Sequence, residues 1–442
     1  MKAIVLLLRV ISASIICFCS CRVQGFVLDT PGKRLVVAKR TATTAVSGSA
    51  SRRITVLRGS SSENIGDNEN GNKKSETQTL GLITFDLDDT LYPIQKVEEA
   101  ANEAFVKAME RYGFKGLKRD DIVSAAKEIR NEMNIKDPKK AAALTHLEVR
   151  ELAIRREMEK ATLKQKLQDC ADDWATPVES LSSLVVANAK KWSKAAVSDS
   201  MVKAVSTAWE MERHHAAERC LYPEVLDALK QIKREHPTAI IGAVTDGRSN
   251  PLFMTFTLAP LFDFSCSWED DQKDRQNFFH GLDQTGGETS QLTWIYDEAR
   301  YKYAVLKQAA DAMARKEDGG GVVKPLVYPD TYDDRVWIHV GDDLAFDVGG
   351  SAACGAKTIY CELAEKYGQT ARHRYYDDKP QPSWSSTPSL ELRKRYEMAK
   401  TAEPKVTVRL SYLSQLPEAV NSILSASPEL AVHWLFNWFT NQ

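Results

Sequence analysis

An apolar run that ends in two aspartates constrains this chain most. Residues 80–85 read Leu-Gly-Leu-Ile-Thr-Phe, and Asp86 and Asp88 follow directly. Such a run is typical of a strand buried on both faces of an α/β sheet, where ligands lie beyond the carboxyl ends of the strands. Because side chains alternate along a strand with period two, both carboxylates start on the same side. Two carboxylates so close repel each other unless a cation joins them, and hard oxygen ligands favour Mg²⁺.

Other readings of this region and of the composition fail. A calcium loop beginning at Asp86 needs glycine at its sixth position and glutamate at its twelfth, which here are Leu91 and Val97. The triple glycine at 319–321 leads to Val-Val-Lys, which is not a P-loop, and the chain has no zinc spacing. A formal net charge of −1 over 442 residues gives no bulk positive charge for nucleic acid, so no nucleic-acid partner is expected.

The pattern of an apolar run followed by polar residues recurs twice further along the chain. Residues 238–245 form a second apolar run, which ends in Thr245 before a glycine turn. Residues 336–341 form a third, which is followed by Asp342 and Asp343, with Asp347 one helical turn further. Parallel strands deliver the residues that follow them to one edge of the sheet. The ordered set therefore predicts a site where carboxylates and a hydroxyl bind a metal ion and a phosphate.

This ordered set resembles the haloacid dehalogenase superfamily, most of whose members are phosphatases. The first motif matches residues 86–90, the second matches Thr245, and the fourth matches residues 341–359 in detail. The resemblance covers about residues 80–425. It implies an α/β fold with a Rossmann-like parallel sheet as the core and an inserted α-helical cap domain.

The resemblance also implies roles for the residues of the motifs. Asp86 is the expected nucleophile, which forms an aspartyl-phosphate. Asp88 is expected to protonate the leaving alcohol and then to activate water. Dehalogenating members lack the second aspartate of the first motif, so Asp88 favours phosphoester chemistry. The expected substrate-binding residues are Thr90, Thr245, Asp246 and Gly247. The expected Mg²⁺ ligands are Asp86, the backbone carbonyl of Asp88, and Asp342, with Asp343 or Asp347 completing the acidic shell.

The third motif of the family is a lysine just before the helix that leads into the fourth motif. Its charge would hold the nucleophile and the phosphate together. Lys302, near the start of a helix-like run at 298–310, is the favoured candidate. Lys324, which precedes a proline, and Lys273 and Arg275, which follow an acidic stretch, remain alternatives.

Composition divides the chain into segments. Residues 80–94 and 218–425 are the predicted core, and the Ala-, Glu-, Lys- and Leu-rich residues 95–217 are the predicted helical cap. The polar, proline-bearing residues 364–404 are a predicted surface insertion. The aromatic tail, residues 426–442, is expected to dock on the body of the protein, with a protein partner as the alternative.

The N-terminal residues resemble a targeting sequence. Residues 1–25 resemble a secretory signal peptide, and their apolar run is too short and interrupted for a stable membrane span. Residues 26–62 are basic, rich in hydroxyl groups and poor in acids, like a transit peptide, and residues 63–79 are a predicted flexible linker. A signal followed by a transit peptide, with phenylalanine at the junction, resembles the bipartite plastid address of algae with secondary plastids; plain secretion is the alternative.

The sequence thus predicts a plastid Mg²⁺-dependent phosphatase that acts on a small phosphorylated metabolite through an aspartyl-phosphate. Two alternatives remain open. The chain could retain the fold as a catalytically weak or inactive structural or regulatory protein, or it could be a phosphomutase, whose product retains the phosphate.

Overall fold

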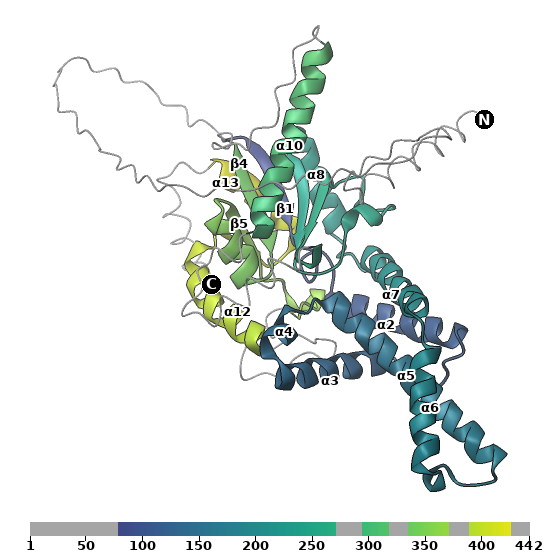
Figure 1. Ribbon diagram of the computed structural model, residues 1–442. Helices are drawn as coiled ribbons and strands as arrows, with labels where there is room; N and C mark the ends of the chain where they lie inside the picture. Colours follow the sequence, from purple (N-terminus) through teal and green to yellow (C-terminus); the bar gives the residue numbers. More distant parts are fainter. Residues whose placement is uncertain (1–77, 271–293, 318–334, 371–388, 426–442) are drawn as a thin grey trace, which may run out of the picture. The chain divides into compact units, whose positions relative to one another are not determined.

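In the described part of the chain, six strands form one sheet in the order β3-β2-β1-β4-β5-β6, and every neighbouring pair is parallel. The predicted α/β sheet is therefore confirmed. β1 (Leu80–Phe85) lies between β2 (Ile240–Thr245) and β4 (Val336–Gly341). Every residue of β1 is buried, as expected for a strand that is covered on both faces. The three strands that precede the predicted site residues therefore lie side by side (Figure 1).

The computed structural model describes residues 78–270, 294–317, 335–370 and 389–425. Several predictions concern residues outside these ranges: the signal peptide, the transit-like segment, all but the last two residues of the linker, and the aromatic tail. The third-motif alternatives Lys273, Arg275 and Lys324 also lie outside the described residues. Plastid import and a partner for the tail stay predictions from the sequence.

Helices connect and flank the strands. The other strands are β3 (Phe264–Ser267), β5 (Lys357–Cys361) and β6 (Val408–Leu410). The helices of the core are α8 (Val225–Glu235), α10 (Trp294–Glu317), α11 (Ser351–Ala353), α12 (Ser389–Ala402) and α13 (Leu416–Ser425). A π-helix, η5 (Leu344–Gly350), follows β4. Short 3-10 turns are η2 (Pro251–Phe253), η3 (Trp268–Asp270), η6 (Glu365–Tyr367), η8 (Glu403–Lys405) and η9 (Leu413–Gln415).

The two faces of the sheet bury different apolar clusters. Ile83 and Phe85 of β1 belong to the cluster that contains residues of α8 and α13. Leu82 belongs to the cluster that contains Ile295 and Ala299 of α10. Neighbouring residues of β1 therefore face opposite helical layers, as the period of two requires. The sheet lies between these layers, and the strand ends are the part of it left for ligands.

The residues between β1 and α8 form helices that have an apolar core of their own. Their elements are α2 (Ile94–Arg111), α3 (Asp121–Lys136), α4 (Pro138–Ala143), α5 (His146–Asp173), η1 (Val178–Ser180), α6 (Ser183–Ala196) and α7 (Asp199–Arg219). Helix α2 packs on α7, and α3 packs on α5 (Figure 1). Phe105, Ile154 and Trp209 are buried in this second core. Its action as a cap over the site stays a prediction. None of the described helices is both long and apolar enough to cross a bilayer.

Glu269 connects the end of the sheet to the inserted helices. It lies in η3, directly after β3, and its carboxylate accepts hydrogen bonds from the N–H groups of His146 (2.8 Å) and Leu147 (3.1 Å). These are the first residues of α5, whose N–H groups have no partner within the helix. A carboxylate at this end also interacts favourably with the helix dipole. Glu269 therefore fixes the start of α5 against the core.

We expect Glu269→Ala to lower the free energy of unfolding by about 1–2 kcal/mol, because part-buried N–H groups lose a charged acceptor. Equilibrium urea denaturation measures the change. Glu103→Ala is the control, since Glu103 is 53% exposed in its pair with Lys107 and its removal should cost less than ~0.5 kcal/mol. Equal losses in the two variants would contradict the role given to Glu269.

Candidate active site

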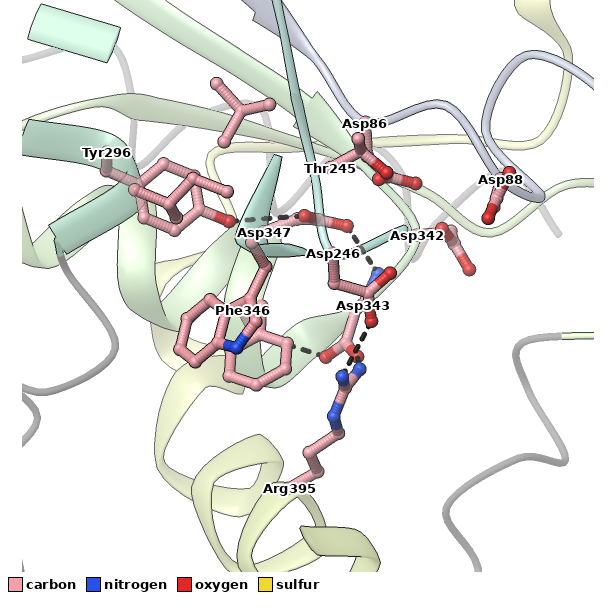
Figure 2. A pocket seen from close by; sticks show the side chains of 13 residues that line it. Asp86, Asp88, Thr245, Asp246, Tyr296, Asp342, Asp343, Phe346, Asp347 and Arg395 are labelled. Carbon is pink, nitrogen blue, oxygen red and sulfur yellow. Dashed lines mark hydrogen bonds and ion pairs between the residues drawn. The ribbon is translucent and has the colours of Figure 1, made fainter. Parts of the chain in front are cut away.

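Three strand ends build one pocket. The N–H of Asp86 donates to the carbonyl of Val340 in β4 (2.9 Å), which ties the residues after β1 to the neighbouring strand. The residues that line the pocket are Asp86, Asp88, Val244, Thr245, Asp246, Trp268, Ile295, Tyr296, Asp342, Asp343, Phe346, Asp347 and Arg395. Figure 2 shows their side chains turned toward a common space. The structure thus brings the aspartates and the threonine of all three predicted motifs together, while their chemical roles stay predictions.

Asp86 and Asp88 reach this pocket by a turn and not by a continued strand. β1 ends at Phe85, and the chain then turns, with Asp89 at φ 60°. Aspartate is one of the few non-glycine residues that adopt this left-handed conformation readily. The alternation expected from a strand through residue 88 is therefore replaced by turn geometry, which delivers both carboxylates to the same pocket.

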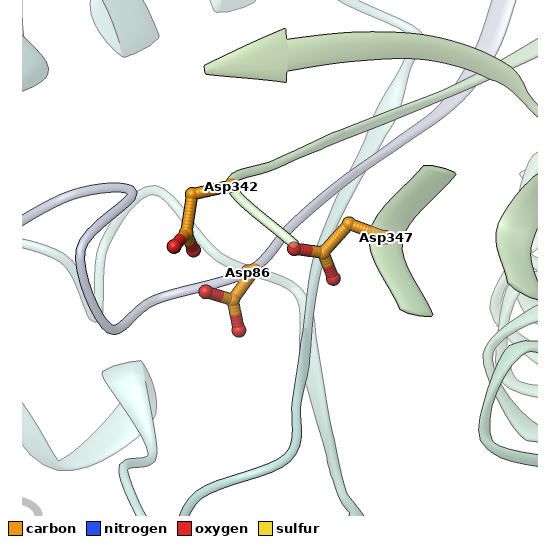
Figure 3. Close-up of side chains that lie close together, drawn as sticks. All are labelled: Asp86, Asp342 and Asp347. Carbon is orange, nitrogen blue, oxygen red and sulfur yellow. The ribbon is translucent and has the colours of Figure 1, made fainter. Parts of the chain in front are cut away.

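Asp86, Asp342 and Asp347 form a group that fits a metal ion. Each offers one carboxylate oxygen, and these oxygens lie within 4.8 Å of one another (Figure 3). All three residues are buried. Burial, followed by the charges of Asp347 and Asp342, raises the pKa of Asp86 well above its ordinary value. Burial and the charge of Asp343 do the same to the pKa of Asp347. A divalent cation would offset the repulsion between these buried carboxylates, and three carboxylates suit Mg²⁺.

Thr90 holds two members of this group in place. Its hydroxyl lies 3.1 Å from Asp342 Oδ1 and 3.3 Å from Asp86 Oδ2, so it donates to carboxylates from two different strand ends. Thr90 was predicted to bind substrate, but it is not among the residues that line the pocket. The Thr90 hydroxyl donates its proton to these carboxylates, because they are the acceptors within hydrogen-bonding distance.

Gly247 was also predicted to bind substrate, and it too is absent from the pocket lining. Its N–H donates to Thr245 Oγ1 (3.2 Å), and its carbonyl accepts from Ser267 Oγ (2.6 Å). A Cβ at this position would lie 2.8 Å from Asp88 Oδ2. A side chain at this position would therefore displace the Asp88 carboxylate, and glycine lets the turn after β2 approach it.

Asp343 was predicted as a possible metal ligand, but the structure engages its carboxylate elsewhere. Oδ1 accepts from the N–H groups of Ala345 (2.7 Å) and Phe346 (3.1 Å) at the start of η5, and Oδ2 pairs with Arg395 (2.9 Å). This carboxylate caps a helix whose first N–H groups need an acceptor. Asp347 is instead the third member of the group that fits a metal ion.

Asp347 is oriented by buried donors. Its carboxylate accepts from the backbone N–H of Asp343 (2.9 Å), from Tyr296 Oη (3.3 Å) and from His339 Nε2 (3.2 Å). Burial lowers the pKa of His339 to about 3, so the ring is neutral at pH 7 and supplies one N–H. A Cβ on Gly341 would lie 2.2 Å from Asp347 Cγ, so the glycine at the end of β4 makes room for this carboxylate.

Asp88 is held by an arginine from the inserted helices. Nη2 of Arg213, in α7, lies 2.6 Å from Asp88 Oδ2, and its Nε lies 3.0 Å from Glu98 Oε1 in α2. Arg213 also donates to Ser249 Oγ, after β2. Burial raises the pKa of Asp88, and the charge of Arg213 opposes that rise. The inserted helices therefore set the charge environment of a residue that lies at the end of β1.

One comparison, with solved structures, finds relatives of this chain. The chain is similar to solved structures of the haloacid dehalogenase superfamily. A 2-haloacid dehalogenase from Pseudomonas syringae pv. Tomato DC3000 is 16% identical over 77% of this chain and 98% of that chain, with a TM-score of 0.35. An L-2-haloacid dehalogenase from Xanthobacter autotrophicus is 12% identical over 78% and 100%, with a TM-score of 0.32. A HAD phosphatase from Thermococcus onnurineus is 12% identical over 77% and 98%, with a TM-score of 0.28.

No protein-family model matches the chain. No curated protein matches it either. Identities of this size carry no activity from the solved structures to this chain, so any activity has to follow from the site itself.

Lys302, the favoured third-motif residue, does not line the pocket. Its Nζ donates to the carbonyl of Ser265 (2.8 Å) and pairs with Glu298 (3.3 Å). The reason is where the helix begins: α10 starts at Trp294, and Lys302 lies eight residues further on, about 12 Å along the axis. The residues of α10 that do line the pocket are Ile295 and Tyr296, neither of which carries a positive charge. The structure therefore does not bring Lys302 into the pocket, and its catalytic role stays a prediction.

Sequence reasoning missed several residues that the structure places in or beside the pocket. These are Tyr296, Arg395, Arg213 and His339. Tyr296 precedes the helical run that the sequence indicated, and His339 looks like any other residue of a buried strand. Arg213 and Arg395 carry no local motif, because each meets its carboxylate through the packing of elements far apart in the sequence.

Proposed function

We propose that this chain is a Mg²⁺-dependent phosphatase that removes phosphate from a small phosphorylated metabolite. The observation that carries the proposal is the buried group of Asp86, Asp342 and Asp347, in a pocket that Asp88 and Thr245 also line. Closely spaced carboxylates with raised pKa values are costly for stability, and such costs are concentrated at functional sites. Their number and spacing fit a cation better than a purely structural role.

The residues support a two-step transfer. In the first step a carboxylate oxygen of Asp86 attacks phosphorus, the bond between phosphorus and the leaving oxygen breaks, and Asp88 donates its proton to that oxygen. In the second step Asp88 takes a proton from water, and the resulting hydroxide attacks phosphorus and releases the Asp86 carboxylate. Thr245, which lines the pocket at the end of β2, would donate its hydroxyl proton to a phosphoryl oxygen. When bound, Mg²⁺ would supply positive charge that offsets repulsion between the carboxylate and the phosphate.

The same contacts support a role of the inserted helices in closing the site. Arg213 joins α7 of the inserted helices to Asp88 and, through Ser249, to the residues after β2. A movement of these helices would therefore change the surroundings of Asp88 directly. Lid elements that complete a site only when substrate is bound exclude water from the reaction. This supports the role of the inserted helices as a cap that responds to the leaving group.

One observation favours the second candidate, a structural or regulatory protein that retains the fold without strong activity. Lys302 lies away from the pocket, and the described residues of α10 offer no other cation to it. The test uses the purified full-length protein with p-nitrophenyl phosphate. We expect hydrolysis with Mg²⁺ and none after EDTA treatment. No turnover on a broad panel of phosphate esters, at any Mg²⁺ concentration, would favour the structural protein instead.

We expect Asp342→Asn to weaken Mg²⁺ binding by ~10- to 100-fold, because one of the three carboxylates loses its charge. Isothermal titration with MgCl₂ measures this affinity without any turnover. Asp120→Asn is the matched control, since the Asp120 side chain is 80% exposed at the start of α3. Mg²⁺ affinity that is the same in both variants would contradict the assigned metal site.

A further inference from the structure

Arg395 is a buried cation in the pocket that no motif of the sequence indicated. Its side chain extends from α12 and is only 4% exposed. Nη1 lies 2.9 Å from Asp343 Oδ2, and Nη2 lies 2.6 Å from Asp246 Oδ2. The guanidinium carbon lies 4.0 Å from the centre of the Phe346 ring. Figure 2 shows the side chain reaching from its helix to these carboxylates. The segment predicted as a surface insertion thus contributes a residue to the site.

Arg395 lines the same pocket as the expected nucleophile, Asp86. Asp246 follows β2, Asp343 is the second residue after β4, and β1 lies between these strands. Arg395 therefore bonds to residues that follow the two strands on either side of β1. Asp246 also directly follows Thr245, whose hydroxyl is the proposed donor to the phosphoryl group. Arg395 and Thr245 line the same pocket.

The charges in the pocket require a cation there. Six aspartates line it: Asp86, Asp88, Asp246, Asp342, Asp343 and Asp347. Of the described residues in the lining, Arg395 is the one basic side chain. A phosphate monoester is an anion, and the six carboxyl groups outnumber the positive charges that one divalent metal ion and Arg395 would supply. A second positive group is needed to bring the substrate in.

We propose that Arg395 binds and orients the oxyanion of the substrate, a role that the sequence assigned to Lys302. The proposal rests on the phosphatase function proposed above. The planar guanidinium matches the geometry of a phosphoryl group with two parallel donors, which a lysine ammonium does not. Asp246 and Asp343 fix the plane of the guanidinium, and the Phe346 ring supports one of its faces. Helix α12 is thereby the element that carries the anion-binding group of this site.

A structural role for Arg395 makes a different prediction. Helix α12 packs on η5, and the bond to Asp343 alone would serve to fasten them together. In that case the loss of Arg395 lowers the melting temperature and leaves the binding of phosphate unchanged in the folded protein. An anion-binding role changes KM and the inhibition constant of inorganic phosphate, and a small guanidinium compound restores them.

The test compares Arg395→Ala, Arg395→Lys and Lys400→Ala in the full-length protein at saturating Mg²⁺. Lys400 lies on the same helix, is 52% exposed and pairs with Glu397, so Lys400→Ala removes a charge from α12 outside the pocket. We expect Arg395→Ala to raise the KM for p-nitrophenyl phosphate and the inhibition constant of phosphate by ~10- to 100-fold. Arg395→Lys should show a smaller increase, Lys400→Ala should match the wild type, and added methylguanidinium should partly rescue Arg395→Ala.

The outcomes separate the two proposals. Wild-type values of both constants in the folded Arg395 variants would overturn the role of Arg395 and leave the phosphatase intact. An absence of turnover in the wild type would overturn both. If circular dichroism shows that Arg395→Ala is unfolded, the kinetic constants of Arg395→Lys test the proposal, because this variant keeps the positive charge and loses the planar guanidinium. Constants equal to those of Lys400→Ala would then overturn the proposal.

Discussion

Asp86→Asn is expected to lower the turnover of p-nitrophenyl phosphate by at least ~10³-fold, because an amide does not replace a carboxylate as the attacking group. Steady-state assays with Mg²⁺ measure the loss. The substitution is nearly isosteric, so the pocket keeps its shape and the donor Thr90 keeps an acceptor oxygen. Asp120→Asn, at an exposed position, should retain full turnover. Turnover in Asp86→Asn within ~10-fold of the wild type would contradict the role of Asp86.

The same variant should be more stable than the wild type when metal is absent. Burial, Asp347 and Asp342 raise the pKa of Asp86 in the folded protein. A raised carboxyl pKa means that the folded state retains a proton that the unfolded state has already lost. The associated stability is present below the unfolded value of about 4 and is lost as the pH rises through the folded value. The melting temperature of Asp86→Asn should therefore exceed that of the wild type by a margin that grows with pH.

This stability difference has its own check. Thermal melts in EDTA at a series of pH values compare the wild type with Asp86→Asn, and addition of Mg²⁺ should reduce the difference, because the cation binds the wild-type carboxylates. A wild type that is more stable than the variant at every pH in EDTA would show that Asp86 is not in a repulsive cluster.

Asp88→Asn is expected to lower turnover by ~10²- to 10⁴-fold, the range over which positioned acids and bases act. The amide neither donates a carboxyl proton to the leaving oxygen nor takes one from water. Folding should be preserved, because Arg213 keeps its bond to Glu98 and its contact with Ser249. Circular dichroism and thermal melts verify that the variant is folded before its kinetics are compared.

The leaving group separates an acid role of Asp88 from a purely structural one. An alkyl phosphate releases a basic alkoxide that needs a proton, whereas p-nitrophenolate leaves without one. The loss in Asp88→Asn should therefore be larger for glycerol phosphate than for p-nitrophenyl phosphate. Equal losses on the two substrates would contradict proton donation by Asp88.

The strands and the acidic residues of the site could be predicted because their signals are local. Each apolar run ends at the residue where the structure ends its strand, as for Phe85, Thr245 and Gly341. Parallel pairing then brings the following aspartates to one edge without further information. The polar residues that follow a short buried strand have to lie at the edge of the sheet. The three motifs therefore meet at one pocket, as expected.

The basic residues could not be predicted because their positions depend on packing over long distances. Lys302 was chosen from its order along the chain, but α10 starts earlier than its apolar pattern indicated, and the lysine points to Ser265 and Glu298. Arg395 follows Asp347 by dozens of residues and enters the pocket only because α12 packs on η5. The spacing of apolar residues within either segment does not predict these contacts.

A structure of the full-length protein with Mg²⁺ and beryllofluoride, a mimic of a transferable phosphoryl group, tests the central claim most directly. The account predicts beryllofluoride attached to a carboxylate oxygen of Asp86, with the Mg²⁺ ion coordinated by Asp86 and Asp342 and with Thr245 donating to a fluorine. Beryllofluoride bound away from Asp86, or a metal ion bound without Asp342, would contradict it.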